Sequence, residues 1–364
     1  MKISDVQLKC IDIPLKKPFK TALRTVNVAE NIIVLIKTDD GAVGFGAAPP
    51  TAAITGDTVD SIIAAVRNHI RSAITGLDIE DIDCVMNAVQ NSVEGNTSPK
   101  AACDMALYDL VGKHYNIPLY KFLGGYRTKL ETDLTISINS PQEMRDDSIT
   151  AVSQGFTALK LKVGIDSRLD IERVKTIREA VGYDVKLRLD ANQGWEPEEA
   201  VEVINMLDKM GMNIEFVEQP VKARDFKGLK YVHDNVDTLI MADESVFSPN
   251  DAIELLQMNA VDLLNIKLMK CGGIYNALKI VSIAECFGVE CMLGCMVESK
   301  VGLAAAAHLA AAKKNITRVD LDAAILLAED PVIGGYRKQI PQFEVLNEPG
   351  LGISGINNMT DIRL

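Results

Sequence analysis

The sequence has few histidines, few aromatic residues and no cysteine pairs at metal-binding spacing. Its 364 residues include four histidines and one tryptophan, and its seven cysteines form no CxxC pair. An odd number of scattered cysteines is typical of reduced thiols rather than of a disulfide framework. Because no histidine stands near any motif described below, the sequence argues against catalysis by histidine.

Positive charge and long apolar runs are also scarce. With 38 Lys and Arg against 50 Asp and Glu, the formal net charge is −12, which would repel nucleic acid and anionic membrane surfaces. The longest apolar run, at 303–312, is too short to span a bilayer, and the first 19 residues have no apolar core of signal-peptide length. We therefore expect a cytoplasmic protein whose partner is a small molecule.

The order of strand and helix patterns divides the chain into three parts. Residues 1–125 mix both patterns and predict an α+β capping domain. In 126–337, eight strand-like runs alternate with amphipathic helices, which predicts a (β/α)8-type TIM barrel in the α/β class. An open doubly wound sheet would carry a Gly-rich phosphate turn after its first strand, and the sequence has none. Residues 338–364 leave the repeat and are expected to pack back on the capping domain.

Ionisable residues stand at the ends of most of these strand-like runs. They are Lys160, Lys162, Asp190, Glu218, Asp243, Lys267, Asp320 and Asp322. The ends of barrel strands meet at one rim, so these side chains are expected to lie together. Carboxylates on three consecutive strands, Asp190, Glu218 and Asp243, repel one another without a cation, which favours a metal site over helix caps or solvated loops. Oxygen ligands select Mg²⁺, with Mn²⁺ as the alternative ion.

Two lysines are expected on opposite sides of the barrel mouth. Lys162 ends the second strand and Lys267 the sixth, and these strands are diametrically opposed in a ring of eight. A substrate carbon between them would have one amine on each face, which suits removing a proton and returning it on the other side. Lys160 points the same way as Lys162, so it should lower the basicity of its neighbour and help neutralise a substrate carboxylate. The acidic pair Asp320 and Asp322 would hold a cationic group.

Five motifs resemble the muconate lactonizing enzyme branch of the enolase superfamily, in which a Lys or His base works with Mg²⁺. They are KLK at 160–162, DANQGW after Leu189, VEQP after Phe216, MADES after Ile240 and NIKLMKCGG after Leu264, and the similarity spans nearly the whole chain. Within that branch, DLD at 320–322 resembles the dipeptide epimerases, in which two carboxylates hold a free amino group. TALRTV at 21–26 and PPTAAITGD at 49–57 resemble the capping loops of L-Ala-D/L-Glu epimerases.

The resemblance implies an isomerase, a Mg²⁺-dependent dipeptide epimerase that moves a proton through an enediolate. Lys162 and Lys267 would be catalytic, and Asp190, Glu218 and Asp243 would bind the metal. The implied substrate-binding residues are Lys160, Arg24, Thr135, Cys295, Met296, Asp320 and Asp322, with Arg24 meeting a glutamate side-chain carboxylate. The substrate would be a dipeptide from peptidoglycan breakdown, and a homo-oligomer is expected because relatives commonly self-associate.

Several alternatives stay open at this point. Arg24 could equally be a solvated charge, and Glu244 and Glu298 could support the metal or a lysine or form structural ion pairs. The glycine-rich turn at 270–273 is expected to give a tight passage from strand to helix, with phosphate binding as the weaker option. Cycloisomerases, o-succinylbenzoate synthases and N-acylamino acid racemases share the scaffold, but their substrates lack the free ammonium that DLD suits. A non-catalytic, metal-containing peptide-binding protein would not need two opposed lysines.

Overall fold

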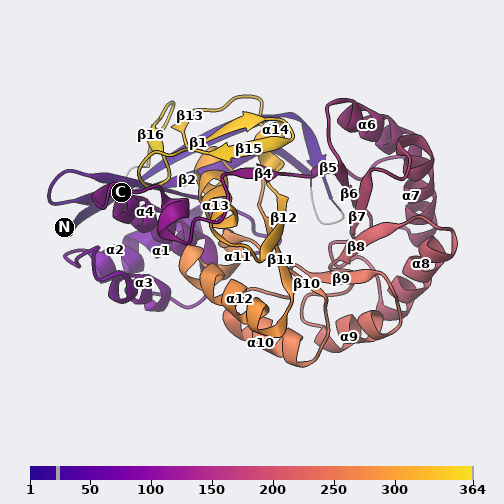
Figure 1. Cartoon of the computed structure of the whole chain (residues 1–364). Coiled ribbons are helices and arrows are strands. Elements are labelled where there is room, and N and C mark those ends of the chain that lie inside the picture. Colours follow the sequence, from indigo (N-terminus) through magenta and orange to yellow (C-terminus); the bar gives the residue numbers. More distant parts are fainter. Residues whose placement is uncertain (22–24, 363–364) are drawn as a thin grey trace.

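The structure, a computed structural model, describes residues 1–21 and 25–362 (Figure 1). Its first part is an antiparallel sheet of four strands in the order β17-β1-β2-β3. Helices cover this sheet, and both ends of the described chain lie in this part of the molecule (Figure 1). The strands are β1 (Ile3–Lys20), β2 (Thr25–Thr38), β3 (Val43–Ala48) and β17 (Thr360–Asp361), and the helices are α1 (Val59–Ala65), a π-helical turn (Val66–Ile70), α2 (Arg71–Ile74), α3 (Ile82–Asn91), α4 (Thr97–His114) and α5 (Leu119–Phe122).

Two glycines let β3 lie directly against α4. A Cβ added to Gly46 would stand 1.8 Å from the carbonyl oxygen of Ala102, and one on Gly44 would stand 2.0 Å from that of Ala106. Because any larger side chain would collide with helix backbone, glycine is the residue that permits this approach. The helix so placed is buried over most of its length, and it connects the first part of the chain to the barrel.

The second part is a sheet of eight parallel strands that wraps into a nearly closed barrel. Its strands are β5 (Leu134–Ile136), β6 (Ala158–Lys162), β7 (Lys186–Asp190), β8 (Ile214–Glu218), β9 (Leu239–Ala242), β10 (Leu263–Ile266), β11 (Glu290–Gly294) and β12 (Ile316–Asp320). The ends of the sheet meet where the backbone N–H of Asp133 donates to the carbonyl oxygen of Val319 at 3.3 Å and that of Leu321 donates to Thr132 Oγ1 at 2.8 Å. All eight predicted strands are present, and the predicted (β/α)8-type barrel is confirmed.

Helices surround the barrel and begin at residues that the sequence marks clearly. They are α6 (Pro141–Ser153), α7 (Ser167–Val181), α8 (Pro197–Lys209), α9 (Phe226–Asp234), α10 (Pro249–Gln257), α11 (Leu268–Cys271), α12 (Ile274–Phe287), α13 (Lys300–Ala312) and α14 (Ala323–Leu326). Before α6, Ser140 accepts a hydrogen bond from the backbone N–H of Glu143 in a capping box. The side chains of Asp166 and Ser248 also accept hydrogen bonds from backbone N–H groups at the starts of α7 and α10, so polar caps fix where these three helices start.

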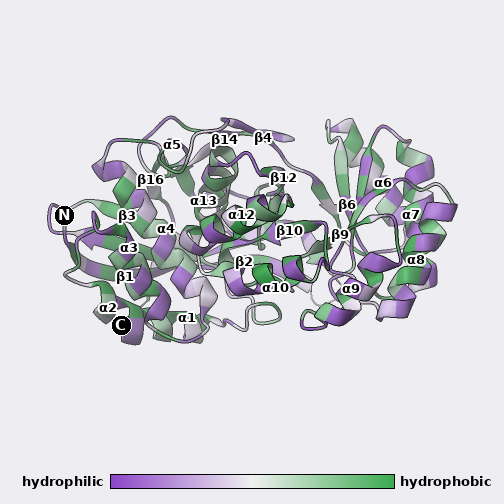
Figure 2. Ribbon diagram, turned by 60° about the horizontal axis from the view of Figure 1, so that its bottom comes forward, coloured by the Kyte–Doolittle hydropathy of each residue, from purple (hydrophilic) through white to green (hydrophobic). Residues whose placement is uncertain are grey.

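Hydrophobic residues fill both sides of the barrel wall. Figure 2 shows hydrophobic strands inside and hydrophilic stretches on the outward faces of the helices. Inside the barrel, Phe216, Met241, Leu263 and Met292 form a core of their own, separate from the larger core. Successive strand residues point to opposite faces, so one strand serves both cores. None of the helices in the described ranges is long and apolar enough to cross a membrane.

The end of the chain adds small antiparallel sheets. The strands are β13 (Val332–Gly334), β14 (Tyr336–Gln339), β15 (Gln342–Val345), β16 (Ile353–Ile356) and β4 (Lys129–Glu131), and β14, β15 and β4 form one sheet. The short strand β17 pairs with β1, where Thr360 lies opposite Cys10 and Asp361 opposite Lys9. The division into 1–125, 126–337 and 338–364 remains a prediction.

Candidate active site

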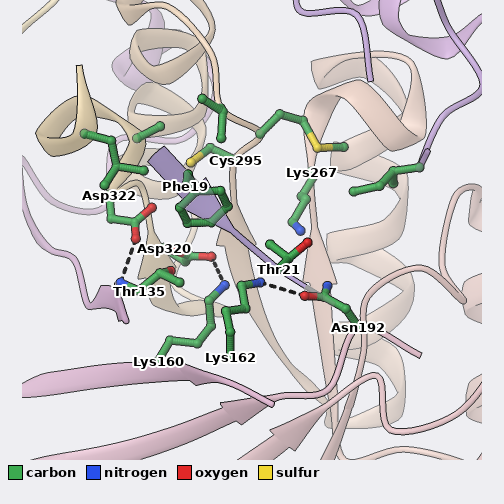
Figure 3. A pocket seen from close by; sticks show the side chains of 15 residues that line it. Phe19, Thr21, Thr135, Lys160, Lys162, Asn192, Lys267, Cys295, Asp320 and Asp322 are labelled. Carbon is green, nitrogen blue, oxygen red and sulfur yellow. Dashed lines mark hydrogen bonds and ion pairs between the residues drawn. The ribbon is translucent and has the colours of Figure 1, made fainter. Parts of the chain in front are cut away.

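A small cavity of about 50 Å³ lies where the barrel strands end (Figure 3). Eight residues singled out in the sequence line it, namely Thr135, Lys160, Lys162, Lys267, Cys295, Met296, Asp320 and Asp322. Phe19, Thr21, Ile54, Asn192, Val297, Ala323 and Leu326 complete its lining. Arg24 lies outside the described residues. The structure therefore brings residues from several strands and from the first part of the chain to one space.

The lysines reach this cavity from facing sides. Lys160 and Lys162 are two residues apart on β6, so both project into the barrel, and both are buried. Lys267 directly follows β10 and points into the cavity from the side that faces them (Figure 3). Gly294 at the end of β11 leaves room for this side chain, because a Cβ there would stand only 3.0 Å from Lys267 Cε.

Lys160 is surrounded by carboxylates. Its ammonium forms an ion pair with Asp320 and lies 3.6 Å from Glu218 Oε2 and 3.9 Å from Asp190 Oδ2. Burial alone would lower the pKa of Lys160, but the charge of Asp320, followed by those of Glu218 and Asp190, outweighs burial and raises it. Lys160 is therefore a permanent positive charge between the predicted metal ligands and the acidic pair of β12.

Lys162 is held by two neighbours on the strand beside it. Its Nζ lies 2.5 Å from Asp190 Oδ2 and donates to Asn192 Oδ1 at 3.0 Å. The amide of Asn192 in turn donates to Glu244 Oε1 at 3.1 Å, which fixes the orientation of Asn192. Glu244 is thus linked to Lys162 through one side chain.

The three predicted metal ligands lie behind the cavity and are fully buried. Asp190 and Glu218 are neighbours in the register of β7 and β8, and Asp243 directly follows β9. Asn265 Nδ2 donates to Glu218 Oε1 at 2.7 Å, while Glu218 Oε2 has no hydrogen-bond partner. Three buried carboxylates, two of them with an oxygen that accepts no hydrogen bond, and no softer ligand fit a hard divalent cation such as Mg²⁺.

Ammonium groups occupy the space among these carboxylates. Asp243 Oδ2 lies 2.6 Å from Lys267 Nζ, and Asp243 Oδ1 lies 2.5 Å from Lys270 Nζ. Burial opposes ionisation of Asp243, but the charges of Lys267 and Lys270 hold its pKa well below its usual value. Because each carboxylate is turned toward a lysine or an amide, no three acidic, His or Cys side chains in the described chain are gathered around one point.

The acidic end of the cavity is built from β12 and β5. Asp322 accepts a hydrogen bond from the backbone N–H of Thr135 at 2.7 Å, and Asp320 pairs with Lys160. Burial raises the pKa of Asp322, and the charge of Asp320 adds to this effect. Burial, followed by the charge of Asp320, raises the pKa of Cys295 well above its usual value, so this residue lines the cavity as a neutral thiol.

The glycine-rich turn at 270–273 binds a carboxylate of the protein itself. Asp104 of α4 accepts hydrogen bonds from the backbone N–H groups of Ile274 at 2.6 Å and Tyr275 at 3.1 Å, at the start of α12. A Cβ on Gly273 would stand 2.3 Å from Asp104 Cγ, so glycine is needed at this position. The contact favours the interpretation of a tight passage over that of a phosphate site.

The sequence analysis did not predict several residues of the site. Asn192 lines the cavity from the turn after β7, where strand alternation no longer applies. Asn265 of β10, which contacts Glu218, lies two residues before Lys267, so the period of two could have pointed to it. Thr21 and Ile54 lie in the two motifs, 21–26 and 49–57, that resemble capping loops, whereas Phe19 lies outside both and was not expected.

Comparison with known proteins places the chain among characterised relatives. Residues 3–124 match the family model "Mandelate racemase / muconate lactonizing enzyme, N-terminal domain", and residues 143–356 match "Enolase C-terminal domain-like". The chain is 55% identical over 358 residues to the L-Ala-D/L-Glu epimerase of Clostridium acetobutylicum, an alignment that covers 98% of this chain and 100% of the relative.

Solved structures agree with this comparison. The substrate-liganded L-Ala-D/L-Glu epimerase of Bacillus subtilis superposes with a TM-score of 0.97 at 52% identity, covering 98% of this chain and 99% of the other. The dipeptide epimerase of Enterococcus faecalis, complexed with Mg and L-Leu-L-Tyr, gives a TM-score of 0.94 at 48% identity, covering 98% and 100%. The chain therefore belongs to the mandelate racemase/muconate lactonizing enzyme family of the enolase superfamily.

Proposed function

We propose that the chain is a Mg²⁺-dependent dipeptide epimerase that acts on L-Ala-D/L-Glu and inverts the α-carbon of the C-terminal residue. The observation that carries the proposal is that Lys162 and Lys267 open onto one buried cavity from facing sides. Relatives at 55% and 52% identity that bear the name L-Ala-D/L-Glu epimerase support the choice of substrate.

One lysine removes a proton from one face of the substrate, and the other lysine returns a proton to the opposite face. For one epimer, Lys162 removes the α-proton and Lys267 delivers a proton to the other face of the planar enediolate; for the other epimer the roles are reversed. The numbers of protons removed and returned are equal, so the reaction needs no oxidant or further reactant. Asn192 accepts a hydrogen bond from Lys162 and so holds its amine toward the cavity.

The remaining side chains orient a zwitterionic dipeptide. Asp320 and Asp322 receive its free ammonium, and the backbone N–H of Thr135 keeps the carboxylate of Asp322 in place. Cys295 and Met296 form part of the wall, and Arg24 remains the predicted partner of the glutamate side chain. In this proposal the ammonium lies at the β12 side of the cavity and the α-carbon between the lysines.

The substrate carboxylate is expected between Lys160 and the predicted metal ligands. Asp190, Glu218 and Asp243 would hold Mg²⁺, which would supply positive charge to stabilise the negative charge that develops on the substrate carboxylate. Structures of relatives complexed with Mg and dipeptides support this ion. Lys160 contributes a further fixed positive charge beside Glu218 and Asp190.

The proposal also includes a cytoplasmic homo-oligomer that acts on dipeptides from peptidoglycan breakdown. The oligomer and the source of the dipeptides rest on the resemblance to dipeptide epimerases, and the cytoplasmic location rests on the scattered cysteines and the short apolar runs.

The test is incubation of the Mg²⁺-loaded enzyme with a dipeptide panel in D₂O, followed by mass spectrometry and chiral separation. We expect one deuterium at the α-carbon of the C-terminal residue of L-Ala-L-Glu and L-Ala-D-Glu, and interconversion of the two. If no dipeptide incorporates deuterium, the chain is not an epimerase. If deuterium enters only N-acylated amino acids, it is a racemase of acylated amino acids built on the same barrel.

A further inference from the structure

Lys270 is a lysine with no exposed surface. It lies on α11, three residues after Lys267, and its relative exposure is 0%. Burying an ammonium group costs several kcal/mol unless it is fully paired and hydrogen-bonded. The partners of Lys270 must therefore compensate for the unfavourable burial of its ammonium group.

Three acceptors surround the ammonium group of Lys270. Its Nζ lies 2.5 Å from Asp243 Oδ1, donates to the backbone carbonyl of Asn265 at 2.9 Å, and donates to the backbone carbonyl of Asp243. Two hydrogens of the ammonium are thus used by backbone carbonyls, and its charge is paired with the Asp243 carboxylate. The ring of Phe247, with its centroid 5.8 Å from Nζ, closes the remaining side.

Both oxygens of the Asp243 carboxylate are paired with lysines. Lys270 holds Oδ1, and Lys267 lies 2.6 Å from Oδ2. The two backbone carbonyls that Lys270 contacts belong to the residue after β9 and to β10, so the same ammonium ties together the ends of these strands. Lys267 follows β10 directly, and its place therefore depends on the same junction.

We propose that Lys270 is a positioning residue that fixes the carboxylate of Asp243 and, through it, the amine of Lys267; this rests on the proposed epimerase function. Lys270 does not line the cavity, so it acts through Asp243 and Lys267 rather than on the substrate. Because Lys270 pairs with Oδ1 of Asp243, the other oxygen of that carboxylate, Oδ2, faces Lys267. The lysine on the other side, Lys162, is held directly by Asp190 and Asn192 and reaches this junction only indirectly, through Asn192 and Glu244.

Because Lys267 pairs directly with Asp243 and Lys162 does not, the proposal predicts unequal effects on the two lysines. Loss of Lys270 should impair proton removal by Lys267 more than proton removal by Lys162. A general loss of stability would instead slow both reactions alike. Displacing a catalytic group by about 1 Å can cost about 100-fold in rate, so the difference should be large.

The experiment compares Lys270→Met and Lys270→Gln with wild type, all as Mg²⁺-loaded enzyme. The Lys267→Ala variant first identifies the epimer whose exchange depends on Lys267. At saturating Mg²⁺, we expect α-deuterium exchange of that epimer to fall about 100-fold, and that of the other epimer to fall by less than about tenfold. Isothermal titration calorimetry with MgCl₂ alone should also show a Kd changed by about tenfold or more, because Asp243 is no longer held.

The matched control is Lys279→Met on α12, whose ammonium lies over the exposed side of Tyr275, 3.8 Å from the ring centroid. It should leave both exchange rates and the Mg²⁺ affinity unchanged. The proposal is overturned if both Lys270 variants that fold, as judged by thermal melting, lose exchange of the two epimers equally, or keep both rates and the Mg²⁺ Kd of wild type. If neither variant folds, the residue is structural and the proposal is also wrong. Absence of exchange in wild type would reject the epimerase function itself.

Discussion

Lys160 of β6 and Asp320 of β12 form an ion pair that spans the first barrel strand, β5. It joins the two ends of the cavity that are expected to hold opposite charges of the substrate. A zwitterionic dipeptide offers each member a new partner, its carboxylate for Lys160 and its ammonium for Asp320. Binding can therefore exchange one internal pair for two pairs with the ligand, which favours substrates that carry both charges.

The first prediction concerns recognition of the free amino group. Asp322→Asn keeps an oxygen that can accept from the Thr135 N–H but removes the negative charge. We expect a loss of about 1.5–3 kcal/mol in transition-state binding, or roughly 10- to 150-fold in kcat/KM for a free dipeptide, because a charged hydrogen bond is lost. Steady-state kinetics should show this loss, while exposed Asp234→Asn on α9 serves as the control. Equal kcat/KM in wild type and Asp322→Asn would show that Asp322 does not hold the ammonium.

The second prediction separates the two catalytic lysines. Lys162→Ala and Lys267→Ala should each abolish epimerisation, because the proton must leave one face and return on the other. Each variant should keep α-proton exchange with only one epimer, and the retained epimers should be opposite. The lost exchange should fall by about 10²–10⁴-fold, the usual contribution of a general base. Loss of exchange with both epimers in both variants would rule out the two-base assignment.

The third prediction tests the metal ligands by a measurement other than activity. If Asp190, Glu218 and Asp243 hold Mg²⁺, saturating the site should stabilise the folded protein. At 100 times the dissociation constant, the free energy of unfolding should rise by about 2.7 kcal/mol. Thermal melting with MgCl₂ and with a chelator measures this difference. Asp190→Asn should remove it, whereas Asp234→Asn should keep it; a Mg²⁺ effect that survives in Asp190→Asn would place the ion elsewhere.

The sequence predicts those parts of the molecule that follow from periodicity. The alternation of strand and helix gives the barrel, and the period of two places Lys160 and Lys162 on one face. The periodicity of a sequence shows which face of a strand or helix a side chain occupies. It does not show which other side chain lies in contact with it. The contact of Lys270 with Asp243, and that of Asp104 with the start of α12, could not be predicted for this reason. Both arise from turns and packing between distant parts of the chain.

The contacts between the first part of the chain and the barrel could not be predicted from periodicity either. Phe19, Thr21 and Ile54 reach the barrel from the first part of the chain, in which β3 lies closely on α4 and α4 contacts α11 of the barrel. The close approach depends on Gly44 and Gly46, whose missing side chains make space for helix backbone. A glycine in a strand is visible in a sequence, but the helix that it will contact is not.

The last prediction concerns stability in mild acid. His308 on α13 is fully buried, and its Nδ1 accepts a hydrogen bond from the backbone N–H of Tyr120 at 3.0 Å. Burial lowers the pKa of His308 to about 4 in the folded protein, against about 6.5 in an unfolded chain. The unfolded state therefore binds a proton first as the pH falls. The stability that the neutral ring contributes is complete above pH ~6.5 and is lost as the pH falls toward ~4.

Between pH ~7 and ~5, this single group should remove about 2 kcal/mol from the free energy of unfolding. His308→Gln cannot be protonated, so its stability should decrease less over the same interval, by about that amount, even if the substitution lowers stability at neutral pH. Urea denaturation at the two pH values measures both quantities, and His69→Gln at an exposed site should behave as wild type does. Since every other titrating group is shared, identical pH dependence in His308→Gln and wild type would mean that the pKa of His308 is the same in the folded and the unfolded protein.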